Sequence, residues 1–211
     1  MAKESRHHIE QQDVIWYEPF IDEQSVRRNH GTPTYVTFSQ GIAHFTADFS
    51  PNYGEIVYDR YSDGDLGLLG DISVVMYIRP DNYGIGCGLM CKILHNGSFA
   101  IGLATDNGPW GGNENCLWST SDEATFIDAG DDSIALDEWQ HIVYTRTAAG
   151  VGNFYINGVL TGDADQDSGT PTISDSELAV SEDFYFVGDI DYIVIYKKVL
   201  TAEEISNMVN L

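Results

Sequence analysis

Short runs of β-forming residues separated by glycine-containing turns restrict the fold of this chain more than any other feature. Residues 72–78 are rich in β-branched side chains and end in a turn at Pro80. Asn-Gly pairs lie at 96–97, between two apolar runs, and at 157–158, after the run 151–156. Asn-Gly is a strong hairpin signal in this setting, because both residues tolerate the positive φ of a tight turn. The pattern predicts many short antiparallel strands.

One helix is predicted, at the end of the chain. Thr201 and Glu204 have the spacing of a capping box, and Leu200 and Ile205 flank it as a hydrophobic staple. The chain has 211 residues, 43% of them hydrophobic, which suits one domain with a sizeable core. We therefore expect an all-β fold, a two-sheet antiparallel β-sandwich (jelly roll) with a short C-terminal helix. The inner faces are expected to include Ile72, Val74, Met76 and Ile78.

Charge and apolar patterning exclude several partners. Asp and Glu number 33 against 10 Lys and Arg, and the formal net charge is −23. A chain of this charge repels nucleic-acid phosphates and anionic lipid, so we expect no nucleic-acid partner and no membrane insertion. Residues 1–8 contain no apolar run of the kind that a signal peptide needs, so we expect synthesis in the cytoplasm without a signal peptide. The three cysteines are too few for a disulfide scaffold and are expected to be reduced.

The first 37 residues differ in composition from the rest. They hold four of the ten basic residues and are much closer to neutral than residues 38–211. We interpret 1–37 as an N-terminal arm and 38–211 as the sandwich. A near-neutral arm with apolar anchors suits docking onto a neighbouring subunit, and the alternative is that the arm folds back and covers its own sandwich. The expected docking residues are Val14, Ile15, Trp16, Tyr17 and Phe20.

Five segments, in order, resemble the laminin-G-like, concanavalin A-like lectin/glucanase jelly-roll family. They cover the sandwich and leave the arm outside. The resemblance implies the β-sandwich fold, and members of that family serve as glycan-binding, adhesion and spacer modules that often carry calcium. The segments are 72–80 (ISVVMYIRP), 92–101 (KILHNGSFAI), 139–144 (WQHIVY), 154–159 (FYINGV), and 188–196 with 200–205 (GDIDYIVIY and LTAEEI).

The resemblance also implies a possible cofactor, Ca²⁺. Asp191 holds the position of an aspartate that is a common ligand at the start of the last long strand, and Asp48 lies where an early partner is often found. A carboxylate that caps turn amides is an equally good interpretation of Asp191. A second acidic stretch, 163–169, begins like a calcium loop but has Ser168 where the sharp-turn glycine belongs, so a solvated hairpin tip is favoured there.

The segment 106–118 is the most sugar-like part of the chain. It combines tryptophans, whose faces can stack on sugar rings, with Asn and Asp side chains that can bind hydroxyl groups, on a glycine-rich loop. The alternative is that a tryptophan here fills the end of the core, which is the commoner use of that side chain. The candidate ligand-binding residues are Asp106, Asn107, Trp110, Asn113, Asn115 and Trp118.

No motif indicates catalysis. The paired carboxylates of a glycosidase are missing, and no Gly-x-Ser-x-Gly elbow occurs, so we expect no hydrolysis of glucans, galactans or sialosides. A secreted-type fold without a secretion signal, together with the arm, favours a non-enzymatic surface or decoration module of an assembly. The hypothesis is a virus or phage particle, with capsid subunits and cell-surface glycans as partners and the virion surface as location. A stand-alone glycan-binding lectin is the alternative, and a glycoside hydrolase ranks last.

Overall fold

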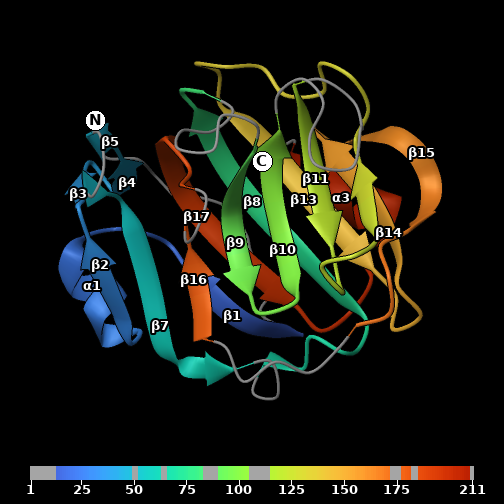
Figure 1. Cartoon of the computed structure of the whole chain (residues 1–211), viewed down its shortest axis with the longest axis horizontal. Helices are drawn as coiled ribbons and strands as arrows, with labels where there is room; N and C mark the ends of the chain where they lie inside the picture. The colour runs from blue at the N-terminus through green and yellow to red at the C-terminus, as the bar shows by residue number, and fades with distance from the viewer. Residues whose placement is uncertain are drawn as a thin grey trace.

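The computed structural model describes residues 13–48, 52–62, 66–82, 90–104, 115–171, 177–181 and 185–209, and it confirms the two-sheet antiparallel sandwich (Figure 1). We call the two layers sheet A and sheet B. Sheet A runs in the order β15 (Val159–Asp167), β14 (Val151–Ile156), β13 (Gln140–Arg146), β8 (Ile72–Pro80), β17 (Gly188–Tyr196), β4 (Ile42–Phe45) and β3 (Val36–Ser39), and β1 (Val14–Glu18) also pairs with β17. Sheet B runs in the order β12 (Phe126–Asp128), β11 (Cys116–Thr120), β10 (Phe99–Ala104), β9 (Met90–Asn96), β16 (Glu177–Val180), β7 (Glu55–Ser62) and β2 (Gly31–Thr34). The remaining elements are the small hairpin of β5 (Ala47–Asp48) and β6 (Asn52–Tyr53), and the helices α1 (Glu23–Arg28) and α3 (Ala202–Val209).

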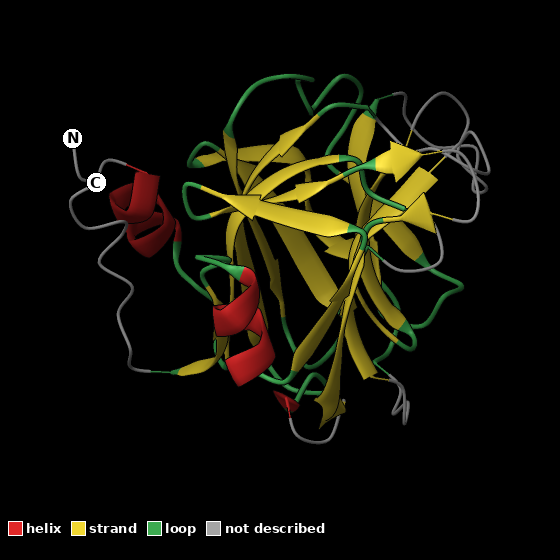
Figure 2. Cartoon of the chain, turned by 90° about the vertical axis from the view of Figure 1, so that its left-hand side faces the viewer, coloured by secondary structure: helices red, strands yellow, loops and turns green. Residues whose placement is uncertain are grey.

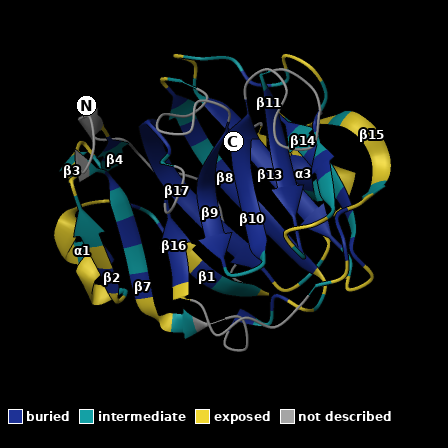
Figure 3. Cartoon of the chain, in the orientation of Figure 1, coloured by how far each residue is buried: buried dark blue, intermediate teal, exposed yellow. Residues whose placement is uncertain are grey.

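The inner faces of the two sheets form one core. Alternate residues of β8 point into it, as predicted: Ile72, Val74, Met76 and Ile78 are fully buried in the main hydrophobic cluster. Figure 3 shows that the central strands of both sheets are buried, whereas the edge strand β15 is largely exposed. Residues 163–167, expected at a hairpin tip, belong to this edge strand. Each fully buried large aliphatic side chain contributes about 1.5–3 kcal/mol relative to leaving it in water.

The predicted turns and helix are present. Asn157 and Gly158 join β14 to β15 with φ of 50° and 82°, the left-handed conformation that this hairpin turn requires. At the start of α3, the Thr201 hydroxyl accepts from the Glu204 amide (3.2 Å) and the Glu204 carboxylate accepts from the Thr201 amide (2.7 Å). Hydrogen bonds from Lys198 and then Thr201 lower the pKa of Glu204 below its usual range.

The C-terminal helix covers the outer face of sheet A. Ile205 of α3 is buried against Leu200, Val194 and Tyr192, in a cluster separate from the main core. Figure 2 shows the helices outside the layers of strands. No helix among the described residues is both long and apolar enough to cross a membrane.

The boundary expected at residue 37 is corrected, because the described part of the arm is built into both sheets. β1 pairs with β17, and β2 pairs with β7. Of the expected docking residues, Trp16 (3% exposed) and Phe20 (0%) lie in the main core, and Ile15 packs against it. Val14 is partly buried on the outer face of sheet A, and Tyr17 is 38% exposed. The arm therefore follows the alternative left open above, in which it covers its own sandwich.

A buried polar contact also ties the arm to the sandwich. Glu18, at the end of β1, is fully buried and accepts hydrogen bonds from the Tyr58 hydroxyl and the Asn29 amide, each at 3.1 Å. Burial raises the pKa of Glu18, and these hydrogen bonds oppose that shift. The short helix α1, which the sequence did not predict, packs Val26 into the same core after a capping box of Asp22 and Ser25.

Candidate functional site

A small hydrophobic cluster lies on the outer face of sheet B, separate from the main core. β9, β10 and β11 each direct alternate side chains away from the core, and several of these are small. Small side chains leave room on the face for one large ring, and that ring belongs to Trp118. The cluster consists of Met90, Ala100, Ala104, Cys116 and Trp118, with Phe126 packed against it.

A glycine creates the space for this ring. Gly102 of β10 lies directly across from Trp118 of β11. A Cβ on Gly102 would stand 2.7 Å from an indole carbon of Trp118 and 1.8 Å from the carbonyl oxygen of Cys91 in β9. The register between β9 and β10 shifts between Ile101 and Gly102, as in a β-bulge. Only glycine fits this position without moving β9.

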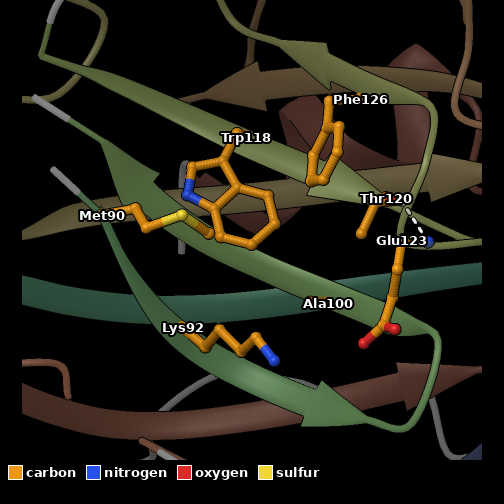
Figure 4. Close-up of a pocket in the computed structure, with 7 residues that line it drawn as sticks. All are labelled: Met90, Lys92, Ala100, Trp118, Thr120, Glu123 and Phe126. Atoms are coloured by element: carbon orange, nitrogen blue, oxygen red, sulfur yellow. Dashed lines mark hydrogen bonds between the residues drawn. The ribbon is translucent and has the colours of Figure 1, made fainter. Parts of the chain in front are cut away.

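The cluster forms one wall of a pocket of about 150 Å³, which we call the Trp118 pocket (Figure 4). The rings of Trp118 and Phe126 are 5.7 Å apart and inclined at 60°. Figure 4 shows the ammonium group of Lys92 and the carboxylate of Glu123 directed toward one another at the opposite end. The pocket therefore joins an aromatic wall to a charged rim. Its lining residues are Met90, Lys92, Ala100, Trp118, Thr120, Glu123 and Phe126.

A rigid turn presents Glu123 to the pocket. Asp122 accepts hydrogen bonds from the backbone amides of Ala124 (2.9 Å) and Thr125 (2.7 Å). Burial raises the pKa of Asp122, but these hydrogen bonds outweigh burial, so its pKa lies below the usual range. Glu123 has φ of 59°, and its amide donates to the Thr120 hydroxyl (3.0 Å). These hydrogen bonds set the position of Glu123 at the edge of the pocket.

Basic and aromatic groups continue this face beyond the pocket. Lys92 and His95 are 8% and 7% exposed, and the Lys92 ammonium lies 3.1 Å from a ring nitrogen of His95. The backbone of Tyr185 forms an isolated parallel β-bridge with that of Lys92. The Tyr185 ring stacks on the ring of Tyr53, with ring centroids 3.9 Å apart. Lys92 pairs with Gly102, which pairs with Trp118. A row of residues from Tyr185 to Trp118 therefore crosses the strands of sheet B.

Of the six predicted sugar-binding residues, only Asn115 and Trp118 lie among the described residues. Asp106, Asn107, Trp110 and Asn113 lie outside the described residues. The side-chain amide of Asn115 donates to Asp132 (2.9 Å). Trp118 lies in the pocket but is 0% exposed, so it is a buried floor and not an open platform, as in the alternative left open for these tryptophans.

Sequence reasoning missed most of the pocket. Trp118 was a predicted site residue because it follows a glycine-rich loop. Its strand, β11, directs the ring to the outer face of sheet B, away from the main core. Lys92 and Phe126 reach the pocket through strand pairing that no local pattern reveals. Cys91 and Cys116 are buried, and Cys87 lies outside the described residues. Burial, followed by the nearby Asp128, raises the pKa of the Cys116 thiol to about 12.

Asp191, the first candidate calcium ligand, lies in β17. Asp191 is 3% exposed and lies where the register between β17 and β8 shifts. The side chain of Asp48 lies outside the described residues. Phe45 of β4 and Gly188 of β17 are paired, and the two strands are antiparallel. From this pair the chain continues in one direction toward Asp48 and in the opposite direction toward Asp191. No cluster of three or more His, Cys, Asp or Glu residues that could hold a metal occurs in the part of the chain that the structure describes.

Calcium binding at Asp191 stays a prediction. If a calcium ion binds the folded protein there, removing it should lower the melting temperature, because a ligand stabilises only the state that binds it. The measurement is thermal unfolding with EDTA and with added CaCl₂. Identical melting curves under the two conditions would remove calcium from the account of this protein.

Comparisons with known proteins agree with the sandwich fold. A family model described as the concanavalin A-like lectin/glucanases superfamily matches residues 58–206. Comparison with curated proteins finds no significant match.

Several solved structures share the fold at low sequence identity. The binding domain of botulinum neurotoxin DC, in complex with rat synaptotagmin II, is 14% identical with a TM-score of 0.67, covering 94% of this chain and 52% of that one. Domain 4 of AbnA, a GH43 extracellular arabinanase from Geobacillus stearothermophilus in complex with arabinotriose, is 20% identical with a TM-score of 0.56 (93% and 98%). The Trypanosoma rangeli sialidase is 13% identical with a TM-score of 0.60 (85% and 29%).

This chain thus spans about half the length of the neurotoxin chain. The structural likeness shows a common fold, and the family model covers more than half of the 211 residues. The chain therefore belongs to the concanavalin A-like lectin/glucanases superfamily.

Proposed function

We propose that this protein is a glycan-binding module and that the Trp118 pocket is its sugar contact. The observation that carries the proposal is the composition of the pocket. Apolar surface from Phe126 and Met90 can pack against the C–H groups of a sugar ring, and Lys92 and Glu123 can bind its hydroxyl groups. Trp118 supports Phe126 from below and stays buried.

The row of residues that crosses sheet B extends this surface. Tyr185 and Tyr53 stack on the far side of Lys92 from Trp118, so a second aromatic surface lies beside the pocket. Two aromatic surfaces separated by a basic group suit a chain of sugars better than a single ring. Among the similar structures, the arabinanase domain is described in complex with arabinotriose, which supports an oligosaccharide as ligand here.

We propose binding without cleavage of glycosidic bonds. Glycosidases use two carboxyl groups on opposite sides of the scissile bond. Glu123 is the single carboxyl group among the seven residues described as lining the pocket. The similar solved structures include binding domains as well as a sialidase. The single carboxyl group in the pocket favours a binding function over glycoside hydrolysis.

Substituting the pocket rim tests the proposal. We expect an oligosaccharide from a panel that includes arabinotriose and both neutral and acidic glycans to bind in isothermal titration. Phe126→Ala and Glu123→Ala should each weaken that binding at least about tenfold, which corresponds to about 1.4 kcal/mol. Both side chains are partly or fully exposed, so the variants should remain folded.

Tyr35→Ala is the matched control, because Tyr35 is a 56% exposed aromatic residue outside the pocket. Its variant should bind as the wild type does. Binding by Phe126→Ala equal to that of the wild type would place the sugar elsewhere, and a panel without any binding would contradict the glycan-binding proposal.

The assembly hypothesis rested on a secreted-type fold without a secretion signal and on the N-terminal arm. The described part of that arm supplies strands to both sheets and side chains to the core. A module on a virus or phage particle would therefore need another docking surface, and we base the proposed function on the Trp118 pocket alone.

A further inference from the structure

A second group of polar side chains lies on the outer face of sheet A, on the opposite side of the sandwich from the Trp118 pocket. Asp189 of β17 pairs across the sheet with Arg79 of β8 on one side and with His44 of β4 on the other. Their neighbours Ile78, Ile190 and the residues beside His44 point into the main core, so these three point outward. Ser39, at the end of β3, lies diagonally across from His44.

The side chains form a connected chain of contacts. The hydroxyl oxygen of Ser39 is 2.7 Å from Nε2 of His44, and Nδ1 of His44 is 2.5 Å from a carboxylate oxygen of Asp189. Arg79 forms an ion pair with the other carboxylate oxygen. An ionised carboxylate only accepts hydrogen bonds, so Nδ1 carries the proton and Nε2 is left to accept from the Ser39 hydroxyl. This is the order of contacts by which a histidine activates a serine nucleophile.

Burial decreases along this chain of contacts toward the serine. The Asp189 side chain is 7% exposed, the His44 side chain is 29% exposed, and Ser39 is an exposed residue. The Arg79 guanidinium also stacks over the ring of Trp139, with 5.8 Å to its centroid, which fixes the group that holds Asp189. The orienting acid is therefore enclosed while the serine hydroxyl faces solvent, as a nucleophile must.

The hairpin turn fixes the position of Ser39. Gln40 and Gly41 join β3 to β4 with φ of 52° and 72°, so both residues have the left-handed conformation of a tight two-residue turn. Ser39 is the last paired residue before this turn, opposite Ile42. Its distance to His44 is therefore set by strand pairing and does not depend on a loose loop.

We propose that Ser39, His44 and Asp189 form an acyl-transfer triad that hydrolyses small acyl esters. The Ser39 oxygen bonds to the ester carbonyl carbon and its proton passes to Nε2 of His44; the bond to the alcohol then breaks, and the alcohol leaves with that proton. Water attacks the acylated serine, again giving its proton to Nε2, and the carboxylic acid leaves as the serine hydroxyl is restored. Asp189 is a positioning residue that holds the imidazole and stabilises it when charged.

The surroundings of Ser39 select the substrate class. Its neighbours Thr37 and Gln40 are exposed and polar, so they offer no apolar surface for a long acyl chain. Because Ser39 stands on an exposed hairpin, an ester carried by a large molecule can reach it without entering a cleft. These features favour acetyl esters. This activity is independent of the glycan-binding proposal and uses the opposite face of the molecule.

Acetylation by p-nitrophenyl acetate tests the triad. We expect release of nitrophenol in a burst, with the acetyl group located at Ser39 by peptide mass spectrometry. Ser39→Ala should abolish this labelling, and His44→Ala should slow it by about 100-fold, the scale of general-base catalysis. Free imidazole should restore part of the rate in His44→Ala and none in Ser39→Ala. Rescue by imidazole distinguishes a base from a residue that merely supports the fold.

Two further variants complete the test. Thr32→Ala removes an exposed threonine side chain on β2, away from the triad, and its labelling should equal that of the wild type. Asp189→Asn should slow labelling per folded molecule, and Asp189→Glu, which keeps a carboxylate, should restore part of the rate. Equal labelling of wild type and His44→Ala, or labelling spread over several serines, would show that Ser39 is an ordinary surface hydroxyl and overturn the proposal.

Discussion

Deletion of residues 1–30 is expected to unfold the sandwich. The deletion removes Trp16, Phe20 and Val26 from the main core and takes β1 from the edge of β17. Truncating one buried Trp or Phe to Ala costs about 3–5 kcal/mol, and the whole stability of a domain is about 5–15 kcal/mol. Losing two such aromatic residues and a strand therefore removes most or all of the stability. Far-ultraviolet circular dichroism and thermal melting of the purified fragment measure this loss of structure and stability.

Substitutions at exposed arm residues provide the control. Tyr17→Ala and Ile21→Ala change side chains that are 38% and 57% exposed, so each should shift the free energy of unfolding by no more than about 0.5 kcal/mol. A truncated protein that stays soluble and melts cooperatively near the wild-type temperature would show that residues 1–30 are dispensable. That result would restore the interpretation of the segment as a docking arm.

The sequence predicted the sandwich because its local signals and its tertiary structure agree. The alternation in 72–78, the turn at Asn157 and the capping box at Thr201 each act over a few residues. The choice between a docking arm and a self-covering arm could not be made from composition, because the place of the segment is decided by pairing with β17, about 180 residues away along the chain. Composition carries no information about such a pairing.

The sites could be predicted only in part, for the same reason. Trp118 was identified from its residue type, but its burial depends on Gly102 and Met90 of neighbouring strands. Ser39 and His44 lie close together in the sequence, but the carboxylate that orients the His44 ring comes from Asp189, far along the chain. No spacing motif joins residues 39, 44 and 189, and none of them lies in a Gly-x-Ser-x-Gly elbow.

Gly102→Ala is the second change with a large expected effect. The φ of Gly102 lies outside the positive range that disfavours side chains, so the reason for glycine here is space and not backbone conformation. The added methyl group would stand 1.8 Å from the carbonyl oxygen of Cys91, which is backbone and cannot rotate away. Overpacking commonly costs about 1–3 kcal/mol, and we expect the upper end or more, since β9 and β10 must separate locally. The melting temperature should then fall by about 6–12 °C, since each kcal/mol lowers it by about 2–4 °C for a chain of this size.

Gly70→Ala is the matched control for this substitution. The nearest atom to a Cβ on Gly70 is the Gly67 carbonyl oxygen at 3.5 Å, an ordinary contact, and its φ is also outside the positive range. This variant should melt within a few degrees of the wild type. Because Gly102 also makes room for the Trp118 ring, Gly102→Ala should in addition weaken oligosaccharide binding, while Gly70→Ala should not. A Gly102→Ala protein that melts and binds like Gly70→Ala would mean that β9 accommodates the methyl group, and that the close approach of the two strands is not required for the Trp118 pocket.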